Sequence, residues 1–131
     1  MRLLLDTHIA LWSSLDQRLL SAGERALLEA PDAAIAVSAV TVWELRLKWG
    51  SYHPSGDRKG AAEPGAVMAF AIGMGWELLP LTPEQAAAAL TVPIAHKDPF
   101  DELLLVQAQE AGLRLLTRDG KLLDHPLAVG G

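Results

Sequence analysis

The sequence predicts an α/β protein, a three-layer α/β/α sandwich in which helices cover both faces of a central parallel sheet of four or five strands. The first observation is that short continuous apolar runs recur along the chain, as the buried strands of a parallel sheet do. The second is that segments with helix-capping signals separate these runs. The third is size, because 131 residues, half of them apolar, suit one domain with one core. Residues 1–131 are therefore expected to form a single domain.

The first half of the chain supplies two strands. The apolar run at 2–5 predicts the first strand, and a helix follows Asp6-Thr7, with Thr7 as its cap. Ser21-Ala22-Gly23-Glu24 has the form of a capping box and predicts a helix through residue 30. The run at 33–37 predicts the second strand, and Ser38 caps the helix after it.

The second half repeats the pattern after a polar stretch at 50–65, which is rich in glycine and proline and predicts a loop. Its length is typical of a functional flap, and local disorder is an equal alternative. Thr82-Pro83 and Asp98-Pro99 each place a capping side chain before a proline at the first helical position. Gly112 is typical of a helix C-cap. The remaining predicted elements are a helix at 66–74, strands at 76–79, 113–117 and 127–129, and one helical turn at 119–123.

Acidic residues follow or approach the carboxyl ends of the predicted strands. Asp6 comes directly after the first strand, and Asp119 comes two residues after the fourth. Glu44 lies less than two turns into the helix after Ser38, and Asp101 lies in the first turn of the helix that leads into the fourth strand. Because the carboxyl ends of parallel strands meet at one edge, these four carboxylates are expected to converge there.

Four carboxylates in one crevice repel each other unless protons or a cation bind. Two unit charges about 4 Å apart repel by about 1 kcal/mol in bulk water and by about 4 kcal/mol at an effective dielectric of 20. Oxygen ligands in a chain without cysteine suit Mg²⁺ or Mn²⁺, as one or two ions. Such ions activate water and offset charge at phosphorus, which indicates phosphodiester hydrolysis.

Each acid also has an ordinary interpretation. Asp6 is equally suited to capping a helix, and Glu44 to a solvated helix surface. Asp101 suits the positive end of a helix dipole, and Asp119 before Gly120 suits a turn. Only convergence distinguishes the metal site from these four separate roles.

Composition excludes several other classes. The net charge is −5, which argues against a nucleic-acid binder that works by a basic surface alone. No apolar run approaches the length of a membrane helix, and a cytoplasmic protein is expected. The four histidines show no i, i+4 pair, which disfavours zinc. The four tryptophans are expected in the core, with Trp49 beside the loop the most exposed.

The ordered motifs resemble the PIN-domain ribonucleases, and most closely the VapC-type toxins of toxin–antitoxin pairs. The motifs are Leu-Leu-Asp-Thr at the start, the segment from Ser38 to Trp43-Glu44, the run from His96 through Asp98-Pro99-Phe100-Asp101, and Thr117-Arg118-Asp119. The resemblance implies a PIN-like fold and an endoribonuclease whose metal-site and catalytic residues are Asp6, Glu44, Asp101 and Asp119. It also implies Thr7, Ser38 and Thr117 as polar neighbours, an RNA substrate, a cognate antitoxin protein that blocks the cleft, and a homodimer.

The sequence departs from this family pattern at two places. Glu102 stands where relatives usually carry arginine, which removes a positive charge near the site. The 50–65 loop is longer and more polar than expected, and its Arg58 and Lys59 are candidates for contacting a phosphate backbone.

Two alternatives remain at this stage. One is an acidic-cleft phosphatase with Asp6 as covalent nucleophile, although such enzymes want a second aspartate where His8 stands. The other is a catalytically degenerate PIN-like domain that binds RNA or protein, with Glu102 as the sign of lost activity.

Overall fold

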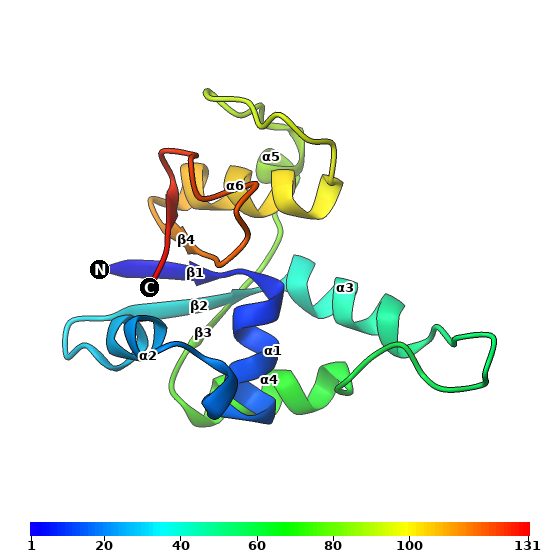
Figure 1. The fold of residues 1–131 in the computed structure, drawn as a ribbon. Coiled ribbons are helices and arrows are strands. Elements are labelled where there is room, and N and C mark those ends of the chain that lie inside the picture. The colour runs from blue at the N-terminus through cyan, green and yellow to red at the C-terminus, as the bar shows by residue number, and fades with distance from the viewer.

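The protein is described by a computed structural model that covers all 131 residues. Its five strands form one parallel sheet in the order β3-β2-β1-β4-β5 (Figure 1). The strands are β1 (Arg2–Leu5), β2 (Ala34–Ser38), β3 (Glu77–Leu79), β4 (Arg114–Leu116) and β5 (Ala128–Val129). The helices are α1 (Thr7–Leu15), the short 3₁₀ helix η1 (Gln17–Leu19), α2 (Ala22–Glu29), α3 (Ala39–Trp49), α4 (Pro64–Gly73), α5 (Pro83–Ala87) and α6 (Pro99–Ala111). The predicted α/β/α architecture is confirmed, with the fifth strand present.

The alternation of side chains along β1 divides the core into two halves. Leu3 and Leu5 are fully buried on one face of the sheet, in a cluster with side chains of α1 and α4. Leu4 is buried on the other face, in a cluster with α6 residues such as Leu104 and Leu105. Figure 1 shows the same layers, with α6 on one side of the sheet and α1, α2 and α4 on the other. Two apolar layers therefore hold the strand ends in fixed positions.

Several predicted boundaries shift by one or two residues, for local reasons. Asp6, and not Thr7, is the N-cap of α1, because its carboxylate accepts from the Thr7 amide. Helix α4 begins at Pro64, which takes the favoured first helical position after Glu63, so the predicted start at 66 was late. The predicted helical turn at 119–123 is a hydrogen-bonded turn in which the amides of Leu122 and Leu123 donate to the Asp119 carbonyl.

The capping predictions are confirmed elsewhere. Ser21 and Glu24 form a capping box at α2, and Ser38 caps α3. Asp98 accepts from two amides of the first turn of α6. Gly112 ends that helix with φ of 69°, a left-handed conformation that glycine adopts without strain.

One prediction about the core is wrong. The tryptophans were expected in the core with Trp49 the most exposed, but Trp43 on α3 is 51% exposed and Trp49 is half-buried. The Trp43 ring lies against Phe100 at a centroid distance of 5.6 Å, so the contact partner is at the start of α6 and not in the sheet layer. Apolar character alone did not reveal on which side of α3 this ring lies.

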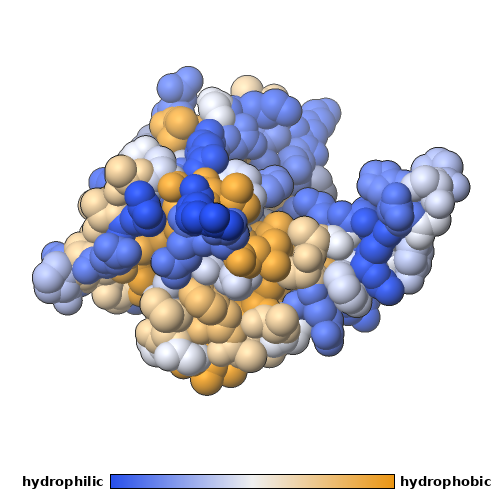
Figure 2. All heavy atoms as spheres, turned by 60° about the horizontal axis from the view of Figure 1, so that its bottom comes forward, coloured by the Kyte–Doolittle hydropathy of each residue, from blue (hydrophilic) through white to orange (hydrophobic).

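The 50–63 segment projects from the end of α3 as a polar loop (Figures 1 and 2). Its own contacts shape it: Tyr52 and Arg58 form an isolated antiparallel bridge, and the Arg58 guanidinium lies 4.0 Å from the Trp49 ring centroid. None of the helices has the length and apolar composition to cross a bilayer.

Candidate functional site

Asp6 is the most deeply placed acid at the carboxyl edge of the sheet. It lies between the end of β1 and the start of α1, and only 7% of its surface is exposed. Oδ1 accepts from the Thr7 amide at 2.7 Å, and Oδ2 accepts from the Thr117 hydroxyl at 2.7 Å. Both donors are neutral. Burial raises the pKa of Asp6, and the nearby Glu44 carboxylate adds to the rise against the opposing effect of the two hydrogen bonds.

Glu44 reaches the same place from α3. Its Oε1 accepts from the Thr7 hydroxyl at 2.8 Å, so Thr7 joins Asp6 through its amide and Glu44 through its side chain. The Thr41 hydroxyl lies 3.3 Å from that of Thr7 and extends the buried polar network. Oε2 of Glu44 pairs with Lys48 one helical turn later, at 3.1 Å. Lys48 is a functional neighbour that the sequence analysis missed, although its i, i+4 spacing from Glu44 was a usable signal.

Asp101 approaches from the first turn of α6. Its Oδ2 lies 3.0 Å from His96 Nε2, and its side chain is 16% exposed. Burial is the main cause of its raised pKa, and the charges of Asp98, Asp6 and Asp119 raise it further. The charges of Asp6 and Asp119 thus act on the Asp101 carboxylate and disfavour its ionisation.

Asp119 completes the set from the turn after β4. Its amide donates to the Thr117 hydroxyl at 3.0 Å, and its Oδ1 accepts from the Lys121 amide at 2.9 Å. Thr117 therefore joins Asp119 to Asp6 through one hydroxyl. Asp6 and Asp119 also line a common surface hollow of about 260 Å³.

The donor chemistry of these four residues fits a hard divalent cation, since carboxylate oxygens are the ligands that Mg²⁺ and Mn²⁺ prefer. As the side chains lie in the structure, no group of three or more histidine or acidic residues is arranged to hold a metal ion. Two of the acids have other partners, Lys48 for Glu44 and His96 for Asp101. A shared ion would therefore require Glu44 and Asp101 to turn away from these partners.

The other predicted site residues lie in two different settings. Ser38 is fully buried, where it accepts from the Val40 amide at 2.9 Å and bonds the Gln107 side chain. Gln107, which the sequence analysis missed, ties this edge to α5 by donating to Gln85 at 3.0 Å. Arg58 of the 50–63 loop donates to the carbonyl of Trp49, the last residue of α3. Neither Arg58 nor Lys59 contacts the four acids.

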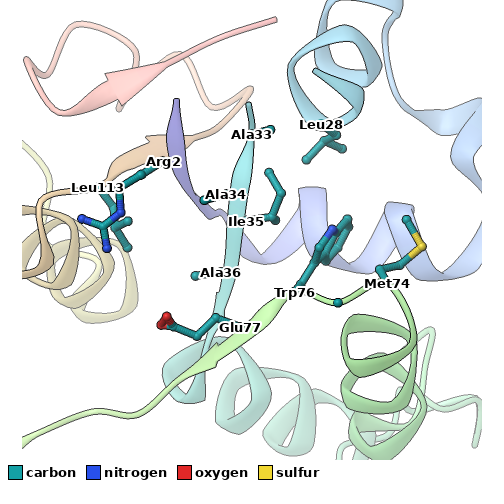
Figure 3. A pocket seen from close by; sticks show the side chains of 11 residues that line it. Arg2, Leu28, Ala33, Ala34, Ile35, Ala36, Met74, Trp76, Glu77 and Leu113 are labelled. Atoms are coloured by element: carbon teal, nitrogen blue, oxygen red, sulfur yellow. The ribbon is translucent and has the colours of Figure 1, made fainter. Parts of the chain in front are cut away.

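The largest hollow in the protein lies elsewhere. It has a volume of about 490 Å³ and lies at the amino ends of the strands, where Ala33 and Ile35 are on the side of Trp76 and Ala34 and Ala36 on the other side of β2 (Figure 3). Most of its lining is apolar, and its only charged residues are Arg2 and Glu77. Since it carries no convergent polar groups, its size does not make it the catalytic site.

Comparison with known proteins agrees with this geometry. The sequence model of the PIN domain matches residues 3–126. Ribonuclease VapC22 of Mycobacterium tuberculosis is 32% identical over 124 residues, which are 93% of this chain and 90% of that protein.

Two solved structures share the fold. One is VapBC2 from Rickettsia felis bound to a DNA fragment from its promoter, with 16% identity, a TM-score of 0.60, and coverage of 100% of this chain and 98% of the other. The second is a toxin–antitoxin complex from Klebsiella pneumoniae, with 20% identity, a TM-score of 0.61, and coverage of 96% and 94%. Because the match extends from β1 across the turn after β4, and one relative exceeds 30% identity over nearly the whole chain, this protein belongs to the PIN-domain family.

Proposed function

We propose that this protein is a divalent-metal-dependent endoribonuclease and the toxin of a toxin–antitoxin pair. The observation that carries the proposal is Asp6, a buried carboxylate that no cationic side chain pairs, with Glu44, Asp101 and Asp119 beside it. A site of this kind has a deficit of positive charge that one or two Mg²⁺ or Mn²⁺ ions would supply. The family and the relative named Ribonuclease VapC22 favour RNA as the substrate.

The roles of the side chains follow from their contacts. Asp6 and Asp119 are held by the Thr117 hydroxyl and are the fixed ligands in this proposal. Glu44 and Asp101 pair with Lys48 and His96 in the metal-free protein, so each would have to leave that partner to hold the cation. When bound, the cation supplies Lewis acidity toward the phosphodiester and the attacking water. A carboxylate of the site that does not hold the cation would accept the proton that this water loses.

The covalent phosphatase alternative has no support in this site. The residue two positions after Asp6 is the exposed His8, so the second aspartate of such enzymes has no substitute there. The degenerate-domain alternative is decided by assay. Glu102 lies next to Asp101 in the first turn of α6 and replaces none of the four proposed acids.

Metal-titrated cleavage of a mixed RNA pool tests the activity. We expect cleavage that depends on Mg²⁺ or Mn²⁺ and that Asp6→Asn abolishes. Asp124→Asn is the matched control, since Asp124 is exposed and its side chain makes no hydrogen bond. Full activity of the Asp6→Asn variant, or no cleavage by the natural protein with either ion, would refute the proposal.

The partners are part of the same proposal. Toxin–antitoxin complexes among the structural neighbours favour a cognate antitoxin that covers the acidic edge, acting with this protein in the cytoplasm. Exposed apolar side chains at the end of α4, Ile72 at 62% and Met74 at 50%, favour a homodimer. Expression of the chain alone in a bacterial host should arrest growth, and Asp6→Asn should relieve the arrest. Harmless expression of a cleavage-active protein would count against the toxin role.

A further inference from the structure

A hollow beside the acids has a lining that the phosphodiester chemistry does not use. Asp6 and Asp119 form one part of it, and His8, Trp12 and Arg118 form the rest. The two acids belong to the proposed metal site. The other three present two aromatic rings and a planar cation, which are the groups on which nucleobases stack.

The rings are placed by α1. His8 and Trp12 are four residues apart, so they lie on the same side of the helix, and their ring centroids are 5.4 Å apart with planes inclined by 34°. His8 is exposed, whereas Trp12 is half-buried and packs against the core cluster under α1. One ring is therefore anchored and the other is accessible.

Arg118 lines the hollow beside Trp12 and is held there by other contacts. Its Cζ atom lies 4.3 Å from the Trp12 ring centroid. Its Nε donates to Glu24 at 3.0 Å and its Nη2 donates to the Leu19 carbonyl at 2.8 Å, so the guanidinium is held in place before any ligand arrives. Its Nη1 donates no hydrogen bond within the protein and is available to an oxygen of a ligand.

We propose that this hollow binds a nucleobase of single-stranded RNA next to the phosphate at the acids, with the base stacked on the exposed ring of His8, which Trp12 supports from the same side of α1. The inference rests on the proposed function, since the acids determine where the phosphate lies. Stacking tolerates any base, because every base has a π face, so the subsite secures the strand without selecting a sequence.

Equilibrium binding tests the subsite independently of cleavage. The probes are a fluorescein-labelled decamer of uridine, rU10, and a decamer of the same length whose sugars carry no base, titrated by fluorescence anisotropy with Ca²⁺ in place of Mg²⁺. The natural protein should bind rU10 about 5- to 100-fold more tightly than the abasic decamer.

Variants at His8 test whether this residue causes the preference for rU10 over the abasic decamer. His8→Ala should lower it at least severalfold, and His8→Phe, which keeps a ring without the imidazole charge, should restore it. His53→Ala is the control, since His53 is an exposed histidine in the 50–63 loop. Equal binding of the two decamers by the natural protein, or an unchanged preference in His8→Ala, would overturn the inference.

The outcomes separate the two proposals. A protein that prefers rU10 through His8 but cleaves no RNA with Mg²⁺ or Mn²⁺ would keep this subsite and lose the proposed activity. A protein that cleaves RNA but binds both decamers equally would keep the activity and lose the subsite.

Discussion

Two acids with little exposure lie near each other in this fold and differ in what neutralises them. Glu24, 1% exposed, receives hydrogen bonds from the Arg118 guanidinium, which holds its pKa below the ordinary value. Asp6, 7% exposed, receives only an amide and a hydroxyl, and burial raises its pKa. The partners are consecutive residues, because Thr117 donates to Asp6 and Arg118 donates to Glu24.

The difference separates an acid that stabilises the fold from one that we propose binds the metal. Glu24 completes a capping box and an ion pair that joins α2 to the turn after β4, so its charge is satisfied within the chain. Asp6 lies among other acids with its charge unsatisfied. Depth of burial does not distinguish the two, whereas the presence of a cationic partner does.

Arg118→Ala gives the largest expected effect on stability. It leaves Glu24 buried without its cation, so we expect a loss of about 3 kcal/mol in the free energy of unfolding, measured by urea denaturation at pH 7. The double variant Glu24→Gln/Arg118→Ala should recover part of that loss, because no buried charge remains. A loss below about 0.5 kcal/mol would show that the pair behaves as an ordinary surface salt bridge.

The pH dependence of the metal-free protein should show opposite signs for the two acids. Asp6 and Asp101 hold protons to higher pH in the folded state, so their ionisation destabilises the fold as pH rises above the ordinary value of 3.8. Glu24 has a lowered pKa, so its stabilisation is present above 4.5 and is lost as pH falls through its folded-state value. Thermal melts from pH 3 to pH 8 in a chelator measure both.

Asp6→Asn tests directly whether the charge of Asp6 destabilises the metal-free fold. Asparagine can accept from the Thr7 amide and donate to the Thr117 hydroxyl, so the hydrogen bonds survive without the charge. The variant should melt a few degrees higher than the natural protein at pH 7 in chelator, with a smaller decline from pH 4 to pH 7. A lower melting temperature at pH 7 would mean that the ionised form of Asp6 is stabilised within the chain.

Lys48→Met gives the smallest expected effect. The pair with Glu44 is an i, i+4 contact whose lysine is 47% exposed, so its loss should cost about 0.3–0.5 kcal/mol in urea denaturation. Because Glu44 is then released from its only cationic partner, the variant should bind Mn²⁺ no more weakly than the natural protein. A weaker affinity would assign Lys48 a direct supporting role at the site.

Local signals in the sequence were enough for the sheet and its strand ends, whereas the metal site formed by the four acids stays a prediction. The leucine run before Asp6 and the proline after Asp98 each gave an element boundary, and parallel topology implied that the strand ends meet. The contacts between residues far apart in the sequence could not be predicted. The hydrogen bond from Thr117 to Asp6 spans 111 residues, and the ion pair of Arg118 with Glu24 spans 94, so no spacing rule indicated either.

Side-chain placement on single elements was also only partly predictable. Trp43 is exposed because its side of α3 faces Phe100 and solvent, a choice that tertiary packing makes. The polar composition of residues 50–65 predicts a loop through Pro64, whereas α4 begins at that residue. Neither error changes the predicted positions of Asp6 and Asp119, because these follow from the ends of β1 and β4.

Calorimetric titration of the chelator-treated protein with Mn²⁺ at pH 7 is the most direct test. We expect binding of one or two ions by the natural protein and by Glu24→Gln, whose charge the chain already neutralises, and loss of at least one ion in Asp6→Asn. Equal Mn²⁺ binding by the natural protein and Asp6→Asn would contradict the view that the unpaired Asp6 carboxylate recruits the metal.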